Sequence, residues 1–162
     1  MSETDRLLEN ARAYAQRFDP DLPMLPSRRV AVLACMDTRL IPSRILGLNE
    51  GEAHILRNAG GVVTDDAIRS LSLSQNLLGT EEIILLHHTE CGMLDFTDEE
   101  YAGRMEAETG ERPSWPAGAF SDVEQSVRDS MARLRESPFI PKKDCIRGFV
   151  FDVKTGELRE IS

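Results

Sequence analysis

Apolar residues follow two patterns along the chain: short continuous runs, and longer stretches in which they recur at helical spacing. The continuous runs predict buried strands at 29–35, 53–57, 82–87 and 145–153, and a short final strand at 158–161. Helical spacing predicts helices at 4–18, 42–48, 64–79 and 120–138, while the stretch 94–119 is the least regular and only partly helical.

Strands and helices alternate, and the strands are nearly continuous in apolar residues. This order predicts an α/β fold, with a mostly parallel central sheet of four to five strands flanked by helices and joined by right-handed crossovers. A length of 162 residues predicts a single domain, 1–162. Its first 26 residues form a helix and a proline-rich connector, and the helix either covers a sheet face or reaches onto a second subunit.

Composition narrows the possible partners. The net charge of −9 argues against nucleic acid or an anionic membrane, because phosphate binding needs a basic face. There is no apolar run of transmembrane length, and the start MSETDRLLEN lacks the features of a signal peptide. Three cysteines without a pairing pattern predict a reducing, cytoplasmic setting.

Reactive side chains gather where two of the predicted strands end. Cys35 closes the first strand, and His88 and Cys91 follow the third. Because open parallel sheets place their sites at the carboxyl ends of the strands, we expect these three side chains to meet. Zinc accepts both thiolate and imidazole ligands in a tetrahedral shell, so the sequence predicts one Zn²⁺ per chain at this edge. A thiol-redox role for Cys35 and Cys91 is less favoured, since no Cys-x-x-Cys motif is present.

The sequence offers no convincing fourth protein ligand. Cys145 begins its strand and should lie at the opposite edge, His87 alternates away from His88, and His54 is near the start of the second strand. We therefore interpret His54 and His87 as hydrogen-bonded structural histidines and Cys145 as a packing residue. Three ligands with one open position are typical of catalytic zinc, which activates a water molecule.

Two further features accompany these ligands. Asp37 and Arg39 would be paired with each other, either as a structural ion pair or, beside zinc, as a dyad in which Arg39 orients Asp37 to accept a hydrogen bond from zinc-bound hydroxide. Gly60 and Gly61 precede a helix without a phosphate-loop motif, so we interpret them as backbone that passes close to the site and leaves room for a small substrate.

The motifs Cys35-Met36-Asp37-Thr38-Arg39 and His88-Thr89-Glu90-Cys91, with Arg57-Asn58-Ala59-Gly60-Gly61 between them, resemble those of the β-class carbonic anhydrases, in particular the compact bacterial and archaeal branch. The likeness is strong from about Val30 to Met93. Thr38 replaces the more usual serine, and Glu90 stands where aspartate is frequent.

The resemblance implies zinc held by Cys35, His88 and Cys91, with Asp37 and Arg39 as the catalytic dyad and attack of zinc hydroxide on carbon dioxide to give bicarbonate. It also implies a homodimer or a dimer of dimers, with the amino-terminal helix laid across the partner. In some members the aspartate becomes the fourth zinc ligand at lower pH, which is a hypothesis for Asp37. Carbonyl sulfide or carbon disulfide hydrolysis on the same site is the alternative function, and a non-catalytic zinc-binding module is a further one.

Overall fold

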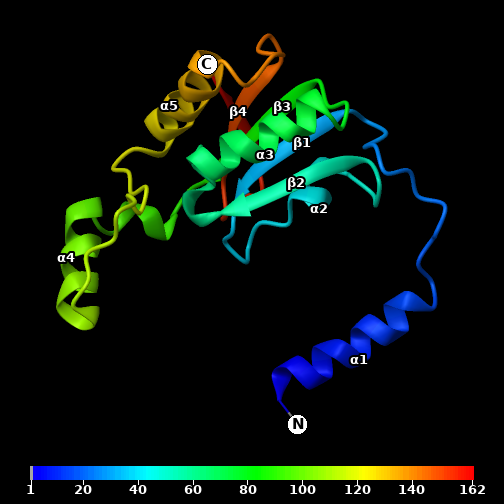
Figure 1. Cartoon of the computed structure of the whole chain (residues 1–162), viewed down its shortest axis with the longest axis horizontal. Helices are drawn as coiled ribbons and strands as arrows, with labels where there is room; N and C mark the ends of the chain where they lie inside the picture. The colour runs from blue at the N-terminus through cyan, green and yellow to red at the C-terminus, as the bar shows by residue number, and fades with distance from the viewer. Residues whose placement is uncertain (1) are drawn as a thin grey trace.

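The computed structural model describes residues 2–162 and contains a five-stranded sheet in the order β2-β1-β3-β4-β5 (Figure 1). Strands β1 to β4 are parallel to their neighbours, and β5 is antiparallel to β4. The predicted α/β class and mostly parallel sheet are therefore confirmed. The strands are β1 (Val30–Cys35), β2 (Ala53–Asn58), β3 (Glu82–His88), β4 (Ile146–Phe151) and β5 (Leu158–Ile161).

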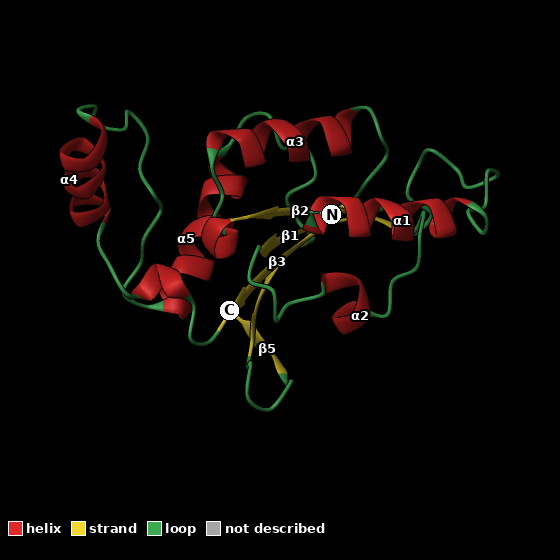
Figure 2. Cartoon of the chain, turned by 90° about the horizontal axis from the view of Figure 1, so that it is seen from below, coloured by secondary structure: helices red, strands yellow, loops and turns green. Residues whose placement is uncertain are grey.

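Helices cover the two faces of the sheet unequally, as Figure 2 shows. Helices α3 and α5 pack on one face, while the short α2 lies on the other. All the predicted helices are present, within a few residues at their ends. The helices are α1 (Glu3–Ala15), α2 (Pro42–Leu46), α3 (Asp65–Asn76), α4 (Asp98–Thr109) and α5 (Val123–Glu136), with short 3₁₀ turns η1 (Ala59–Gly61) and η2 (Gly92–Leu94).

The larger core lies between the sheet and helices α3 and α5. Leu71 of α3 and Leu134 of α5 are fully buried there against strand residues such as Leu85. Helix α5 approaches β4 so closely that a Cβ at Gly148 would lie 2.2 Å from Cγ1 of Val127. This close packing fixes β4 beside β3 and thereby the order of the strand ends.

Helices α1 and α4 stand away from the sheet (Figure 1). Helix α1 buries none of its residues, and its apolar side chains Leu7 and Leu8 are exposed. The alternative in which α1 covers a sheet face is therefore wrong for the isolated chain. Helix α4 begins with a capping box between Thr97 and Glu100, which accounts for helix formation in the irregular stretch. Within residues 2–162, no helix combines the length and the apolarity needed to cross a bilayer.

The register of the parallel strands brings their carboxyl ends together. Ala34 of β1 pairs with Leu86 of β3, so the residues just beyond them share one edge of the sheet. Segments that are far apart in the sequence, around residues 35 and 88, thus meet at a single place.

Candidate metal centre

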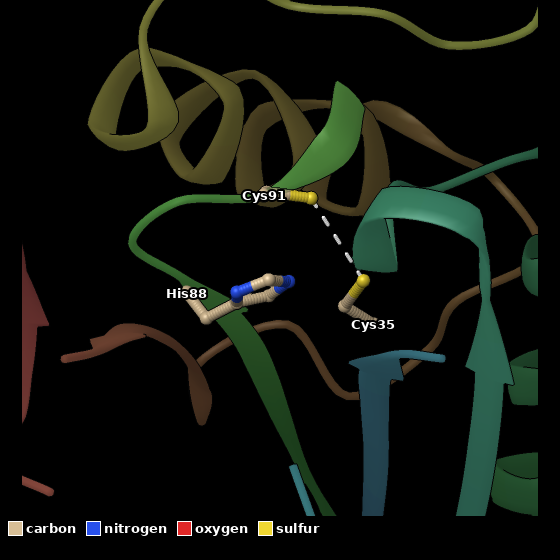
Figure 3. A group of neighbouring side chains, drawn as sticks. All are labelled: Cys35, His88 and Cys91. Carbon is tan, nitrogen blue, oxygen red and sulfur yellow. Dashed lines mark hydrogen bonds between the residues drawn. The ribbon is translucent and has the colours of Figure 1, made fainter. Parts of the chain in front are cut away.

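Cys35, His88 and Cys91 converge at this edge, and all three are buried (Figure 3). Cys35 and His88 are the last residues of β1 and β3, and Cys91 follows in the next turn. Their ligand atoms lie within 4.8 Å of one another, and the two Sγ atoms are 3.9 Å apart. Two sulfurs bound to one tetrahedral zinc at the usual bond length would be about 3.8 Å apart. The donor set and its spacing therefore fit a zinc ion.

The orientation of His88 suits a metal ligand. Its Nδ1 lies 2.8 Å from the Thr89 carbonyl oxygen, which can only accept, so Nδ1 carries the proton. Its Nε2 is then an unprotonated acceptor, and it is buried without a hydrogen-bond partner. An orphaned imidazole nitrogen beside two thiols is what a missing cation would explain.

The thiols of Cys35 and Cys91 are joined by one hydrogen bond. The hydrogen bond from Cys91 lowers the pKa of the Cys35 thiol, and the same bond raises the pKa of Cys91. Such a pair readily holds one negative charge, and a divalent cation would stabilise the second thiolate.

The chain turns sharply after β1. The backbone N–H of Arg39 donates to Oδ1 of Asp37 at 2.9 Å, and Leu40 N–H donates to the Asp37 carbonyl at 3.0 Å. The side chains nevertheless pair as expected: Arg39 Nε and Nη2 donate to the two carboxylate oxygens at 2.9 and 2.8 Å. These bonds lower the pKa of Asp37 far below its usual range.

Asp37 lies beside the candidate metal position. Its Oδ2 is 3.7 Å from Nε2 of His88, while Arg39 holds it from the other side. An ionised carboxylate at this point can accept a hydrogen bond from a water molecule held between the three ligands.

Glu90 belongs to the same cluster, although its contacts could not be predicted from the sequence pattern. Its carbonyl oxygen accepts from Arg39 Nη2 at 3.0 Å, and its carboxylate lies 3.6 Å from Arg39 Nη1 and 2.5 Å from Lys154 Nζ. Glu90 has a φ of 53°, which few residues other than glycine adopt. Lys154 lies more than 60 positions further along the chain, so only the folded structure reveals this contact.

Gly61 passes close to the ligand-bearing strands β1 and β3, and Gly60 packs against the side chains of Met93 and Phe120. A Cβ at Gly61 would lie 2.8 Å from the backbone nitrogen of Cys35. A Cβ at Gly60 would lie 3.1 Å from Cγ of Met93 and 3.2 Å from Cε1 of Phe120. Both glycines have positive φ, so each position disfavours a side chain for two reasons.

The remaining histidines and the third cysteine differ in their burial and hydrogen bonding. His54 is hydrogen-bonded as expected, with Nδ1 2.8 Å from Ser74 Oγ. His87 is fully buried and neither ring nitrogen makes a hydrogen bond of good geometry, although the backbone of Gly61 is near enough to oppose part of the pKa shift; the expectation that His87 is fully hydrogen-bonded is therefore wrong. Its burial lowers its pKa to about 4. Cys145 is exposed rather than packed, and it precedes β4 at the opposite edge of the sheet.

The structure combines a mostly parallel sheet, a Cys–His–Cys cluster at the strand ends and an Asp–Arg pair beside that cluster. This combination defines a class of protein, and comparison with known proteins identifies the class. The family model for carbonic anhydrase matches residues 30–115. The chain belongs to the β-carbonic anhydrase family.

The similarity extends over the whole chain. β-Carbonic anhydrase 1 of Mycobacterium tuberculosis is 54% identical over 162 residues, which cover 100% of this chain and 99% of that protein. The carbonic anhydrase structure from Streptococcus mutans is 44% identical, has a TM-score of 0.92, and covers 100% of this chain and 99% of that one. A carbon disulfide hydrolase from Acidianus is 41% identical, covering 96% of this chain and 87% of the hydrolase.

Proposed function

We propose that this protein is a zinc-dependent carbonic anhydrase that interconverts carbon dioxide and bicarbonate. The observation that carries the proposal is the geometry of the cluster: two thiols at the separation that one zinc requires, and an orphaned imidazole nitrogen beside them. Cys35, His88 and Cys91 would hold one Zn²⁺ per chain. The 54% identity to a β-carbonic anhydrase over the full length supports the same conclusion.

A zinc ion at this position would supply Lewis-acid activation of a water molecule. The protein contributes the orientation of that water. Asp37 would accept a hydrogen bond from that water, and the paired guanidinium of Arg39 keeps Asp37 ionised and fixed. Gly60 and Gly61, whose backbone packs directly beside Cys35, Met93 and Phe120, would lie next to a bound substrate as small as carbon dioxide.

Stopped-flow hydration of carbon dioxide, on protein of assayed zinc content, tests this function. We expect rapid turnover that increases with pH and about one zinc per chain. Zinc-loaded protein without hydration activity at any pH would overturn the proposal. The Asp37–Arg39 pair is intact in this structure, so crystals grown at low and high pH would also test whether Asp37 ever moves to the metal.

Hydrolysis of carbon disulfide or carbonyl sulfide is the second candidate. The 41% identity to a carbon disulfide hydrolase over most of the chain is the observation that favours it. Hydrogen sulfide release from either substrate, without hydration of carbon dioxide, would identify the protein as such a hydrolase. The relative at 54% identity favours the anhydrase.

We further propose that the protein is a homodimer, or a dimer of dimers, in the cytoplasm. Helix α1 has 13 residues and buries none of them in its own chain, and a helix of this length is marginal in water without packing. Its exposed Leu7 and Leu8 would find that packing on a second copy. Free Cys35 and Cys91 are compatible with a reducing compartment.

A further inference from the structure

Arg57, the penultimate residue of β2, binds the main chain of the metal-ligand segment. Its Nε and Nη2 donate to the carbonyl oxygen of Cys35 at 3.1 and 2.8 Å. The same Nη2 donates to the carbonyl oxygen of Asp37 at 2.7 Å. One planar guanidinium thus joins the backbone of a candidate metal ligand to that of the candidate catalytic carboxylate.

The charge of Arg57 is not used in an ion pair. Within residues 2–162, Arg39 beside the candidate centre pairs with Asp37 and Glu90, whereas Arg57 has no Asp or Glu oxygen within 4.0 Å. Its donors point instead at carbonyl oxygens just where β1 ends and the chain turns. A guanidinium is suited to this task because its fixed fork of N–H groups can serve two acceptors at once.

Both the side chain and the main chain of Asp37 are therefore hydrogen-bonded to an arginine. Arg39 binds its carboxylate and Arg57 binds its carbonyl oxygen. Cys35 is held in the same way, since Arg57 binds its carbonyl while Gly61 packs against its backbone nitrogen. The distance between the thiol of Cys35 and the carboxylate of Asp37 therefore depends on Arg57.

We propose that Arg57 is a positioning residue that fixes the Cys35 thiolate relative to the Asp37 carboxylate, and so sets both metal retention and the efficiency of the dyad. This inference rests on the proposed zinc site. Arg57 itself touches neither the metal position nor the substrate. Its effect is transmitted through two backbone carbonyls, so it should alter the geometry of the metal shell.

The test compares Arg57→Gln and Arg57→Lys with Arg104→Gln, a control on exposed helix α4 that removes an arginine paired with Glu108. Three properties are measured on metal-loaded protein: the rate of zinc release to a chelator, the thiolate-to-cobalt absorption after Co²⁺ substitution, and kcat and KM for carbon dioxide. Thermal unfolding of each variant is recorded alongside.

For Arg57→Gln we expect zinc release to be about tenfold faster or more, as for other residues that support metal ligands. The cobalt absorption should shift, and kcat should fall with little change in KM. Arg57→Lys should be intermediate, because an ammonium lacks the planar fork. Arg104→Gln should match the wild type.

Wild-type zinc release and cobalt absorption in Arg57→Gln would overturn the proposal, even if turnover or thermal stability fell. If Arg57→Gln does not fold, Arg57→Lys decides by the same two measurements. Zinc release and cobalt absorption do not depend on the reaction. An inactive wild type would therefore refute the proposed anhydrase function without deciding the role of Arg57.

Discussion

Gly61 lies against the backbone of Cys35, with no space for a side chain between them. A Cβ at position 61 would be 2.8 Å from Cys35 N and 3.1 Å from the Ala34 carbonyl carbon. Both are main-chain atoms of β1, which cannot move there without displacing the thiol of Cys35. Gly61 also has a φ of 69°, which a residue with a side chain rarely adopts.

We expect Gly61→Ala to lower the free energy of unfolding by about 2–4 kcal/mol, from backbone strain and overpacking together. Zinc content should also fall, because Cys35 is displaced. Urea unfolding and metal analysis check both effects. Gly79→Ala is the matched control, since Gly79 has a φ of 75° but open space around its Cβ. Equal losses in the two variants would show that the contact with Cys35 contributes nothing.

The middle of the sheet was predictable from the sequence because β1 and β3 are buried on both faces and read as continuous apolar runs. Val30-Ala31-Val32-Leu33 and Ile83-Ile84-Leu85-Leu86 both follow this pattern. The parallel direction of the strands followed from the strand–helix–strand order, whereas the order of the strands in the sheet comes from the structure. The meeting of Cys35, His88 and Cys91 followed from the parallel direction of β1 and β3, and the structure brings the three together.

Local turns and distant polar contacts were less predictable. The turn after Cys35 depends on a bond from the Arg39 N–H to the Asp37 side chain, and periodicity does not detect such a bond. Arg57 and Glu90 lie within the recognised motifs, but their hydrogen-bond partners Cys35 and Arg39 are many positions away in the sequence, so no local pattern predicts these contacts. The start of α4 had a detectable signal, the Thr97-x-x-Glu100 capping box. Helix α1 could not be placed, because its apolar face finds no partner within its own chain.

At His87 we expect a substitution to raise the free energy of unfolding, whereas Gly61→Ala should lower it. Its imidazole is fully buried, and neither nitrogen makes a hydrogen bond of good geometry. A buried polar group without such a bond lowers the free energy of unfolding by about 1–3 kcal/mol. Leucine has a similar volume and no polar atoms, so His87→Leu should raise the free energy of unfolding by about 1 kcal/mol. Urea unfolding at pH 7 measures this change.

His54→Leu is the comparison for His87→Leu. It removes one of the two partners of the buried Ser74 hydroxyl, Thr80 being the other, and should therefore destabilise the protein by about 1 kcal/mol. Destabilisation in both variants would show that His87 has a hydrogen-bond partner in solution, such as a buried water molecule.

Glu52 gives a prediction about pH, away from the metal centre. The backbone N–H of Asn49 donates to its carboxylate at 2.8 Å and Arg28 lies 3.1 Å away, and these contacts lower the pKa of Glu52. Because the folded pKa is below that of the unfolded chain, about 4.3, the charged form stabilises the fold above that pH. The contribution is lost as the pH falls through the folded pKa.

Glu52→Gln removes the charge but keeps an oxygen for the Asn49 N–H. The variant should therefore be less stable than the wild type at pH 7, and the difference should shrink below about pH 4.3. Urea unfolding at several pH values between 3 and 7 measures the difference. A difference that does not vary with pH would show that Glu52 titrates alike in the folded and unfolded states.

Asp37→Ala separates catalysis from metal binding. Asp37 lies 3.7 Å from the His88 imidazole but is not one of the three converging ligands, so zinc content should stay near one per chain. Turnover should fall by about 100-fold or more, since the water loses its oriented hydrogen-bond acceptor. Asp66→Ala, which removes an exposed carboxylate on α3, is the control and should leave turnover unchanged. Zinc analysis and stopped-flow hydration are both needed. Full turnover in Asp37→Ala would contradict the dyad, whereas loss of zinc would show that Asp37 supports the metal shell rather than the reaction.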